Sequence, residues 1–161
     1  MIIGLGNEMR GDDAAGLRVV DLLAGHGIDA IRFDGEPISL LELWPRSGRV
    51  VLIDAVAGSS PGTISRLEPG GGDLELALAP GSSHLIGLAE VIELGSQLGL
   101  LPAQLELIAI EGAEFGLGRR PSAAVERACE TVAAAIIAEL EVPGPSRPGA
   151  TSSGAAREAR R

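Results

Sequence analysis

Near the start of the chain, a glycine-rich stretch separates two apolar segments, Met1 to Ile3 and Leu17 to Leu23. The first segment is typical of a short strand, and the second has the apolar spacing of a helix. Glycine residues let the backbone turn sharply and let another group approach closely. The sequence therefore predicts a strand-to-helix loop of the kind that carries a ligand. Its residues are Gly4-Leu5-Gly6-Asn7-Glu8-Met9-Arg10-Gly11-Asp12-Asp13-Ala14-Ala15-Gly16.

Three interpretations of this loop compete. A loop that cradles a dinucleotide pyrophosphate needs a third glycine three residues after the second, and Met9 stands at that position. Asp12 and Asp13 would also repel a phosphate at the start of the helix, where the helix dipole should attract one. In the second interpretation, Asp12 caps the helix and Asp13 favours its positive end. In the third, one of the two carboxylates binds a metal.

The charge of the chain argues against a phosphate-binding surface. The formal net charge is -9, and residues 142–161 contain four Arg and one Glu, or +3, which leaves -12 for residues 1–141. Because affinity for nucleic acids depends largely on Lys and Arg, we expect no nucleic-acid partner. The chain has no lysine, which excludes Schiff-base chemistry and a phosphate-loop lysine.

Length and composition favour one globular domain. The chain has 161 residues, of which 45% are hydrophobic but only 2% aromatic, so we expect an aliphatic core. The lone Cys129 lies in a helical pattern and is predicted to be a buried, inert thiol. Residues 142–161 are rich in Pro, Gly and Ser, so we expect a domain over residues 1–141 and a disordered basic tail after it. No signal peptide or membrane-spanning apolar run is visible, so we expect a cytoplasmic protein with no membrane partner.

Strands and helices alternate along the chain, which predicts an α/β fold with a mainly parallel sheet and helices on both faces. Arg49 to Val56 is a continuous aliphatic run, as expected of a central strand covered on both faces. Thr63 to Leu67 alternates and suits a sheet edge. The other expected strands are Met1 to Ile3, Ile28 to Phe33 and Gln104 to Ile110, and the expected helices run from the glycine-rich loop to Ala24, from Pro37 to Trp44, from about Ser83 onward, and from Ser122 to Leu140.

Polar side chains with metal-binding chemistry gather at one edge of this predicted sheet. In parallel sheets, ligands bind beyond the carboxyl ends of the strands. A carboxylate inside an apolar strand, such as Asp54, must be hydrogen-bonded, paired or metal-bound. A histidine in the first turn of a helix, such as His84, should be neutral, which is the form that binds metals. The edge collects Asp13, Asp34, Asp54, His84 and Glu111, and two carboxylates with one imidazole suit zinc, nickel or manganese equally.

Several short motifs occur in an order and spacing that resemble those of the hydrogenase maturation proteases, over residues 1 to about 140. That family removes a C-terminal peptide from the large-subunit precursor of nickel-iron hydrogenase after nickel insertion. The matching pieces are Gly4-Leu5-Gly6-Asn7, Gly11-Asp12-Asp13, Gly16, Ile53-Asp54-Ala55, Pro61-Gly62-Thr63, Ser83-His84, Gly87-Leu88 and Glu111-Gly112.

The resemblance implies a three-layer α/β/α sandwich with a twisted, roughly five-stranded sheet. It also implies an endopeptidase whose nickel-binding and catalytic triad maps onto Asp13, Asp54 and His84. The nickel would be supplied by the substrate, so no tightly bound cofactor is expected. The implied partner is the hydrogenase large-subunit precursor, and we expect a monomer.

One departure from the family pattern concerns the loop after the second strand. Many members carry Gly-Thr soon after the glycine equivalent to Gly35, whereas this chain has Glu36-Pro37-Ile38. This change leaves the identity of the substrate open. Two alternatives to the endopeptidase remain. The altered loop and the absence of an obvious nucleophile favour a non-enzymatic nickel-sensing or chaperone module on the same scaffold. Gly4-x-Gly6 and Asp34 favour a dinucleotide-binding domain.

Overall fold

The computed structural model describes residues 1–68 and 83–141. Residues 69–82 and the basic tail that the sequence predicts over residues 142–161 lie outside the described residues. Within the described part, no helix is both long and apolar enough to cross a membrane. The strands are β1 (Ile2–Leu5), β2 (Ile31–Phe33), β3 (Arg49–Ala57), β4 (Ile64–Leu67) and β5 (Gln104–Gly112), and the helices are α1 (Ala15–Ala24), α2 (Leu40–Leu43), α4 (Ser83–Gln97) and α5 (Ala123–Glu141), with short 3-10 helices η1 (Gly11–Ala14) and η2 (Pro37–Ser39).

The five strands form one sheet in the order β2-β1-β3-β5-β4. β1 pairs in parallel with β2 and β3, and β3 pairs in parallel with β5. The edge strand β4 is antiparallel to β5. The predicted central strand is therefore confirmed, as is the edge position of the alternating segment. Because Asp54 pairs with Ala109 and Ala57 with Gly112, the carboxyl ends of β3 and β5 lie at the same edge of the sheet.

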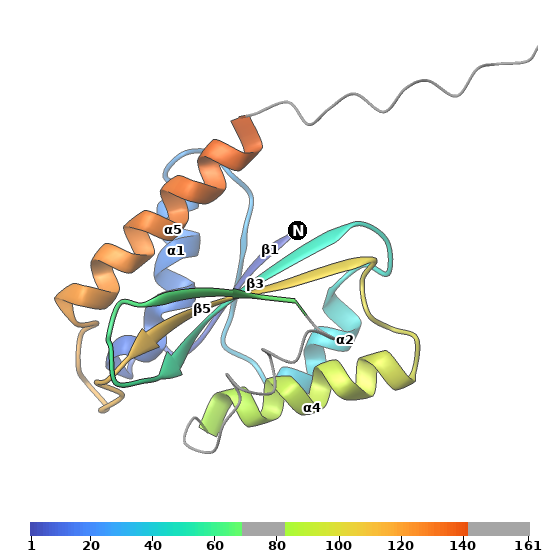
Figure 1. Cartoon of the computed structure of the whole chain (residues 1–161), viewed down its shortest axis with the longest axis horizontal. Coiled ribbons are helices and arrows are strands. Elements are labelled where there is room, and N and C mark those ends of the chain that lie inside the picture. The colour runs from blue at the N-terminus through green and yellow to red at the C-terminus, as the bar shows by residue number, and fades with distance from the viewer. Residues whose placement is uncertain (69–82, 142–161) are drawn as a thin grey trace, which may run out of the picture.

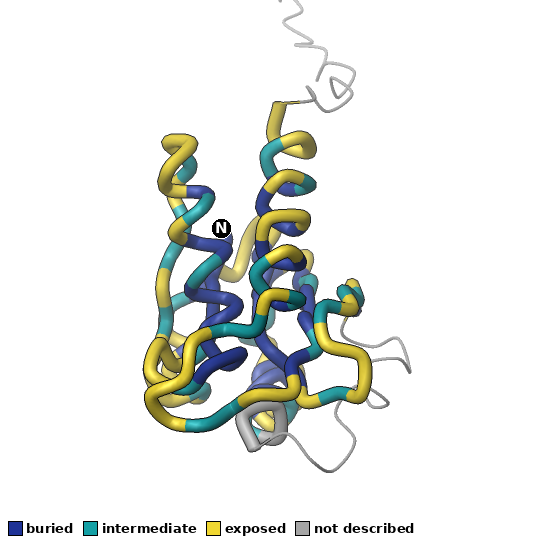
Figure 2. Tube along the Cα trace, turned by 90° about the vertical axis from the view of Figure 1, so that its left-hand side faces the viewer, coloured by how far each residue is buried: buried dark blue, intermediate teal, exposed yellow. Residues whose placement is uncertain are grey.

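Helices cover both faces of the sheet (Figure 1). α1 and α5 lie side by side on one face, while α2 and α4 cover the other. Figure 2 shows that the buried residues follow the strands and the inward sides of the helices. Two aliphatic cores result, one on each face of the sheet, as the near absence of aromatic residues predicts. The three-layer α/β/α sandwich is confirmed.

Trp44 and Cys129 are both buried, and burial of Cys129 confirms the sequence-based prediction. The side chain of Trp44 is 4% exposed, and its Nε1 donates a hydrogen bond of 3.2 Å to the carbonyl oxygen of Leu100. Cys129 is fully buried on the opposite face, where burial raises the pKa of its thiol to about 12. A thiol with such a pKa is not a nucleophile at neutral pH.

Several element boundaries differ from the sequence-based expectation: β1 ends at Leu5 rather than Ile3, and β5 ends at Gly112 rather than Ile110. Asp12 and Asp13 do not open α1 but form η1 before it. The second strand begins at Ile31 rather than Ile28, because the N–H of Ile28 closes the turn after α1 on the carbonyl of Leu23, at 3.1 Å. The helix expected from Pro37 is divided into η2 and the short α2.

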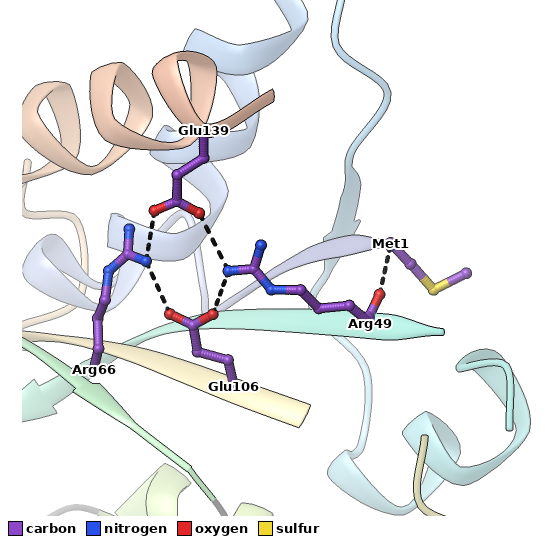
Figure 3. Close-up of polar contacts among 5 residues, drawn as sticks. All are labelled: Met1, Arg49, Arg66, Glu106 and Glu139. Carbon is purple, nitrogen blue, oxygen red and sulfur yellow. Dashed lines mark hydrogen bonds and ion pairs between the residues drawn. The ribbon is translucent and has the colours of Figure 1, made fainter. Parts of the chain in front are cut away.

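Four charged side chains form a ring near the amino ends of β3 and β5 (Figure 3). Arg49 contacts Glu106 at 2.5 Å and Glu139 at 3.2 Å, and Arg66 contacts the same two acids at 3.0 and 2.7 Å. The N-terminal ammonium of Met1 donates to the carbonyl oxygen of Arg49, at 2.8 Å. This ring ties α5 to the sheet at the edge opposite the carboxyl ends of the parallel strands.

Candidate active site

A small pocket opens at the carboxyl edge of the parallel strands. Its volume is about 50 Å³, which is room for one or two water molecules or a single ion. The lining comes from β1, β2, β3 and α4, which confirms that the ends of the first three strands meet at one edge. Polar lining residues are Asn7, Asp34 and Asp54, and the apolar lining includes Leu5, Phe33, Pro37, Leu40 and Leu88.

Asp54 lies in the last part of β3, and its side chain is only 3% exposed. The N–H of Ala55 donates a hydrogen bond of 2.8 Å to its Oδ1. Burial raises the pKa of Asp54 to about 7, the hydrogen bond from Ala55 opposes this rise, and the negative charge of Asp13 adds to it. Asp54 is therefore a carboxylate that exchanges its proton near neutral pH.

Asp13 lies in η1 and is 1% exposed. Its charge acts on the pKa of Asp54, so the two carboxylates are neighbours although 40 residues separate them in the sequence. The structure thus brings together two of the three residues that the sequence predicts for the site.

Glycine residues explain how Asp13 reaches this position. A Cβ on Gly16 would lie 2.2 Å from the carbonyl oxygen of Ile53, and a Cβ on Gly4 would lie 2.1 Å from that of Gly16. The start of α1 therefore packs directly on the backbone of β1 and β3. Gly6 has a φ of 137°, and a Cβ there would lie 1.9 Å from the carbonyl oxygen of Asp13.

These contacts disfavour the dinucleotide-binding interpretation. The space over Gly4 and Gly6, which a pyrophosphate would occupy, is filled by backbone carbonyl oxygens of Gly16 and Asp13. Carbonyl oxygens repel phosphate, whereas phosphate-binding loops present N–H groups. The close approach that the glycine residues permit is that of the protein's own helix.

His84 is the second residue of α4, and its side chain lies outside the described part of the structure. The backbone of α4 nevertheless reaches the pocket edge. Leu88, four residues after His84, lines the pocket, and a Cβ on Gly87 would lie 3.2 Å from Cγ of Pro37. Among the side chains searched in the described residues, no three metal-ligating groups form a cluster. The triad of Asp13, Asp54 and His84 therefore stays a prediction.

Asp12 has a structural role that sequence reasoning missed. It makes no capping hydrogen bond to η1. Instead, its Oδ2 accepts hydrogen bonds of 2.9 Å from the N–H groups of Ala113 and Glu114, and its Oδ1 accepts one of 2.6 Å from Ser122. Burial would raise the pKa of Asp12, but these backbone N–H groups lower it overall. Asp12 therefore stays ionised and holds the β5–α5 loop against η1.

One further candidate from the sequence, Glu111, has contacts that position other groups. Glu111 accepts a hydrogen bond of 3.0 Å from the N–H of Ser60 and packs against Gly58, so it orders the turn between β3 and β4. His26, the other histidine, is exposed in the turn after α1, with Nδ1 3.0 Å from the carbonyl oxygen of Leu22.

Sequence and fold are both similar to those of proteins that act in hydrogenase maturation. The hydrogenase expression/formation protein HupD from Thiocapsa roseopersicina is 31% identical over 148 residues, which cover 83% of this chain and 67% of that protein. The NiFe hydrogenase maturation protease HybD from Thermococcus kodakarensis has a TM-score of 0.68 at 28% identity, over 86% of this chain and 96% of that one. An endopeptidase from Escherichia coli has a TM-score of 0.73 at 22% identity, over 86% and 91% of the two chains, and this likeness shows the fold alone. No family model matches the chain.

Proposed function

Because this chain belongs to the hydrogenase maturation proteases, we propose that it removes the C-terminal extension of a nickel-loaded nickel-iron hydrogenase large-subunit precursor. The family membership makes the chain a peptidase of hydrogenase maturation. The nickel dependence and the position of the cleaved bond are the parts that we propose.

The observation that carries the proposal is the burial of two electrostatically coupled carboxylates, Asp13 and Asp54, of which Asp54 lines a small pocket. Their exposed fractions are 1% and 3%, and the charge of one acts on the pKa of the other. Burial disfavours the charged form of a carboxylate, as the raised pKa of Asp54 indicates, and a nearby cation compensates for that cost. A divalent ion carried by the substrate would provide that compensation.

In the proposed reaction, Asp13, Asp54 and His84 contact the nickel that the precursor carries. Two carboxylates and an imidazole suit a first-row divalent metal and leave positions open for the precursor's own ligands. Such an ion acts as a Lewis acid toward a nearby peptide carbonyl. Because ligating carboxylates must be deprotonated and the pKa of Asp54 is about 7, recognition of the metal should weaken as the pH falls below neutrality.

The test is mass spectrometry of a nickel-loaded large-subunit precursor before and after incubation with the protein. We expect loss of a C-terminal peptide with the unchanged protein and no loss with Asp54→Asn or His84→Ala. Asp54→Asn keeps the size of the side chain and an oxygen that accepts the N–H of Ala55. The fold should therefore persist in this variant.

Matched controls exist in the same chain. His26→Ala removes the other histidine, and Asp29→Asn neutralises an exposed acid in the loop before β2. Both controls should cleave like the unchanged protein. Full processing by Asp54→Asn and His84→Ala would refute the proposed site. Binding of the nickel-loaded precursor without release of any peptide would favour the non-enzymatic module.

A further inference from the structure

An exposed patch that combines apolar and basic side chains lies beside the pocket. We call it the rim patch, and its members are Met9, Arg10, Leu117, Arg119 and Arg120. Met9 is 60% and Leu117 is 80% exposed, the two highest values among the large apolar side chains of the described residues. Arg119 and Arg120 are exposed, and Arg10 is half-buried.

The rim patch is built on a firm backbone platform rather than on a loose loop. The N–H of Gly118 donates a hydrogen bond of 2.7 Å to the carbonyl oxygen of Met9. The N–H of Gly11 donates one of 3.2 Å to the carbonyl oxygen of Arg119. Arg10 and Arg119 form a parallel β-bridge. The carboxylate of Asp12 also joins these two segments, because it accepts hydrogen bonds from backbone N–H groups at both ends of the loop between β5 and α5. Apolar side chains on such a platform stay exposed to solvent, which is unfavourable in hydration free energy. Binding of a partner would remove this apolar surface from water.

The basic members of the rim patch are available to a partner. Within residues 1–68 and 83–141, no ion pair involves Arg10, Arg119 or Arg120, whereas Arg18, Arg32, Arg49 and Arg66 are all paired with acids. Glu114, in the same loop, accepts a hydrogen bond of 3.0 Å from the N–H of Gly116. The three arginines therefore form a locally positive surface on a chain whose net charge is -9. Guanidinium groups of this kind bind carboxylates strongly.

The rim patch is also close to the pocket. Asn7 lines the pocket, and Met9 and Arg10 follow it by two and three residues. Since consecutive Cα atoms are about 3.8 Å apart, the backbone of Arg10 lies within about 11 Å of that of Asn7. A polypeptide that lies over the pocket at Asn7 would reach Arg10 with about three or four extended residues.

From these observations we propose that the rim patch docks a segment of the precursor in which apolar side chains flank one or more carboxylates. The inference rests on the proposed function, because it takes the precursor as the partner. Met9 and Leu117 provide the apolar contact, and Arg119 and Arg120 provide the charge complementarity that selects an acidic segment. The patch contributes to binding of the precursor and takes no part in breaking the bond.

The test uses two paired variants, Met9→Ser with Leu117→Ser and Arg119→Glu with Arg120→Glu. Cleavage is followed as a function of precursor concentration, and binding of the precursor is measured separately. We expect KM to rise roughly tenfold in each pair with kcat unchanged, because the contacts contribute equally to binding before and during the reaction. Raising the salt concentration should weaken binding of the unchanged protein and have little effect on the charge-reversed pair.

Matched controls separate this effect from general changes in surface polarity. Leu98→Ser with Leu140→Ser removes two exposed leucines, each 58% exposed, that are not part of the rim patch. Arg46→Glu with Arg127→Glu reverses two exposed arginines that likewise make no ion pair in the described part of the chain. Both control pairs should keep the KM of the unchanged protein.

The outcomes distinguish this inference from the proposed function. An unchanged KM in both patch variants of an active enzyme overturns the rim patch and leaves the proposed function intact. If the unchanged protein releases no peptide, the proposed function fails, and the binding measurement then decides on the rim patch. Equal binding by patch and control variants, or no binding at all, would overturn it, whereas a selective loss of roughly tenfold in the patch variants would support it.

Discussion

The carboxylate of Asp12 accepts a hydrogen bond of 2.6 Å from the backbone N–H of Ser122, which lies 110 residues later in the chain. Ser122 precedes α5, and its Oγ is 3.4 Å from the N–H of Val125 in the first turn of that helix. A hydrogen bond from a backbone N–H group to a charged acceptor is stronger than one to a neutral acceptor. This pair therefore fixes the start of α5 relative to the segment that carries Asp13.

Replacing Asp12 should destabilise the protein more than replacing an exposed acid. Asp12→Ala leaves three backbone N–H groups without their acceptor, and we expect a loss of about 3 kcal/mol in the free energy of unfolding. Urea unfolding measures this loss, and Asp29→Ala serves as the exposed control. A loss below about 1 kcal/mol would mean that water satisfies these N–H groups instead.

The same contact predicts a dependence on acid. Because the pKa of Asp12 is lowered in the folded state, its stabilisation is fully present above the unfolded value of about 4. It is lost as the pH falls through the folded-state pKa. The difference in free energy of unfolding between the unchanged protein and Asp12→Ala should therefore shrink below about pH 4. A constant difference down to the lowest accessible pH would contradict this assignment.

Gly16 should tolerate no side chain. In Gly16→Ala, the added Cβ would lie 2.2 and 2.3 Å from the carbonyl oxygens of Ile53 and Leu5, so α1 must move away from the sheet. We expect a loss of about 3 kcal/mol and reduced processing, because Asp13 moves with the helix. Gly25→Ala, at the end of the same helix, is the matched control. Its Cβ would meet only Leu22, at 3.3 Å, and Asp21, at 3.8 Å, so it should cost little.

Asp54 should make the protein less stable as the pH rises. Its pKa is raised from an ordinary value near 4 to about 7, so the folded state holds a proton that the unfolded state releases. Stability relative to Asp54→Asn should then fall between about pH 4 and pH 7, by up to about 4 kcal/mol, and stay constant above pH 7. Urea unfolding of both proteins at several pH values measures this difference. A flat difference would show that Asp54 is ionised throughout.

The ring of Arg49, Arg66, Glu106 and Glu139 should contribute modestly and in a salt-dependent way. Burial would raise the pKa of Glu139, but hydrogen bonds from Arg49 and Arg66 lower it overall. Glu139→Gln should reduce the free energy of unfolding by about 1 kcal/mol or less, and the reduction should largely vanish near 1 M salt. Glu130→Gln, an exposed position on the same helix, is the control. An effect that persists at high salt would indicate packing rather than charge.

The fold was largely predictable because apolar patterns along the chain are local signals. The continuous apolar run of β3 indicates burial on both faces, and the alternation of β4 indicates an edge. The boundary at Asp12 and Asp13 was not predictable, because η1 is held by distant contacts. The N–H of Asp12 donates a hydrogen bond of 2.7 Å to the carbonyl oxygen of Glu114. No pattern among the residues near Asp12 in the sequence predicts this contact.

A site residue could be predicted where its side chain was chemically unusual for the strand or helix that contains it, or where the fold class fixed its position. Asp54 was identified because a carboxylate is unexpected in an apolar strand, and Asp13 because parallel strands end at one edge. The sequence gives no means of separating the roles of two adjacent aspartates, since the partners of Asp12 lie 101 to 110 residues away. Met9 and Leu117 were missed because single apolar residues in loops have no periodicity.

The lengths of the strands limit how this protein holds other polypeptides. The long strands β3 and β5, of nine residues each, are interior, whereas the edge strands β2 and β4 have only three and four residues. An exposed strand edge is the template on which a foreign chain adds as an extra strand, and such short edges offer few backbone groups for this purpose. The sheet is thereby protected from edge-to-edge aggregation. Short edges of this kind favour recognition of a bound polypeptide through its side chains, which makes recognition depend on sequence rather than on extended conformation alone.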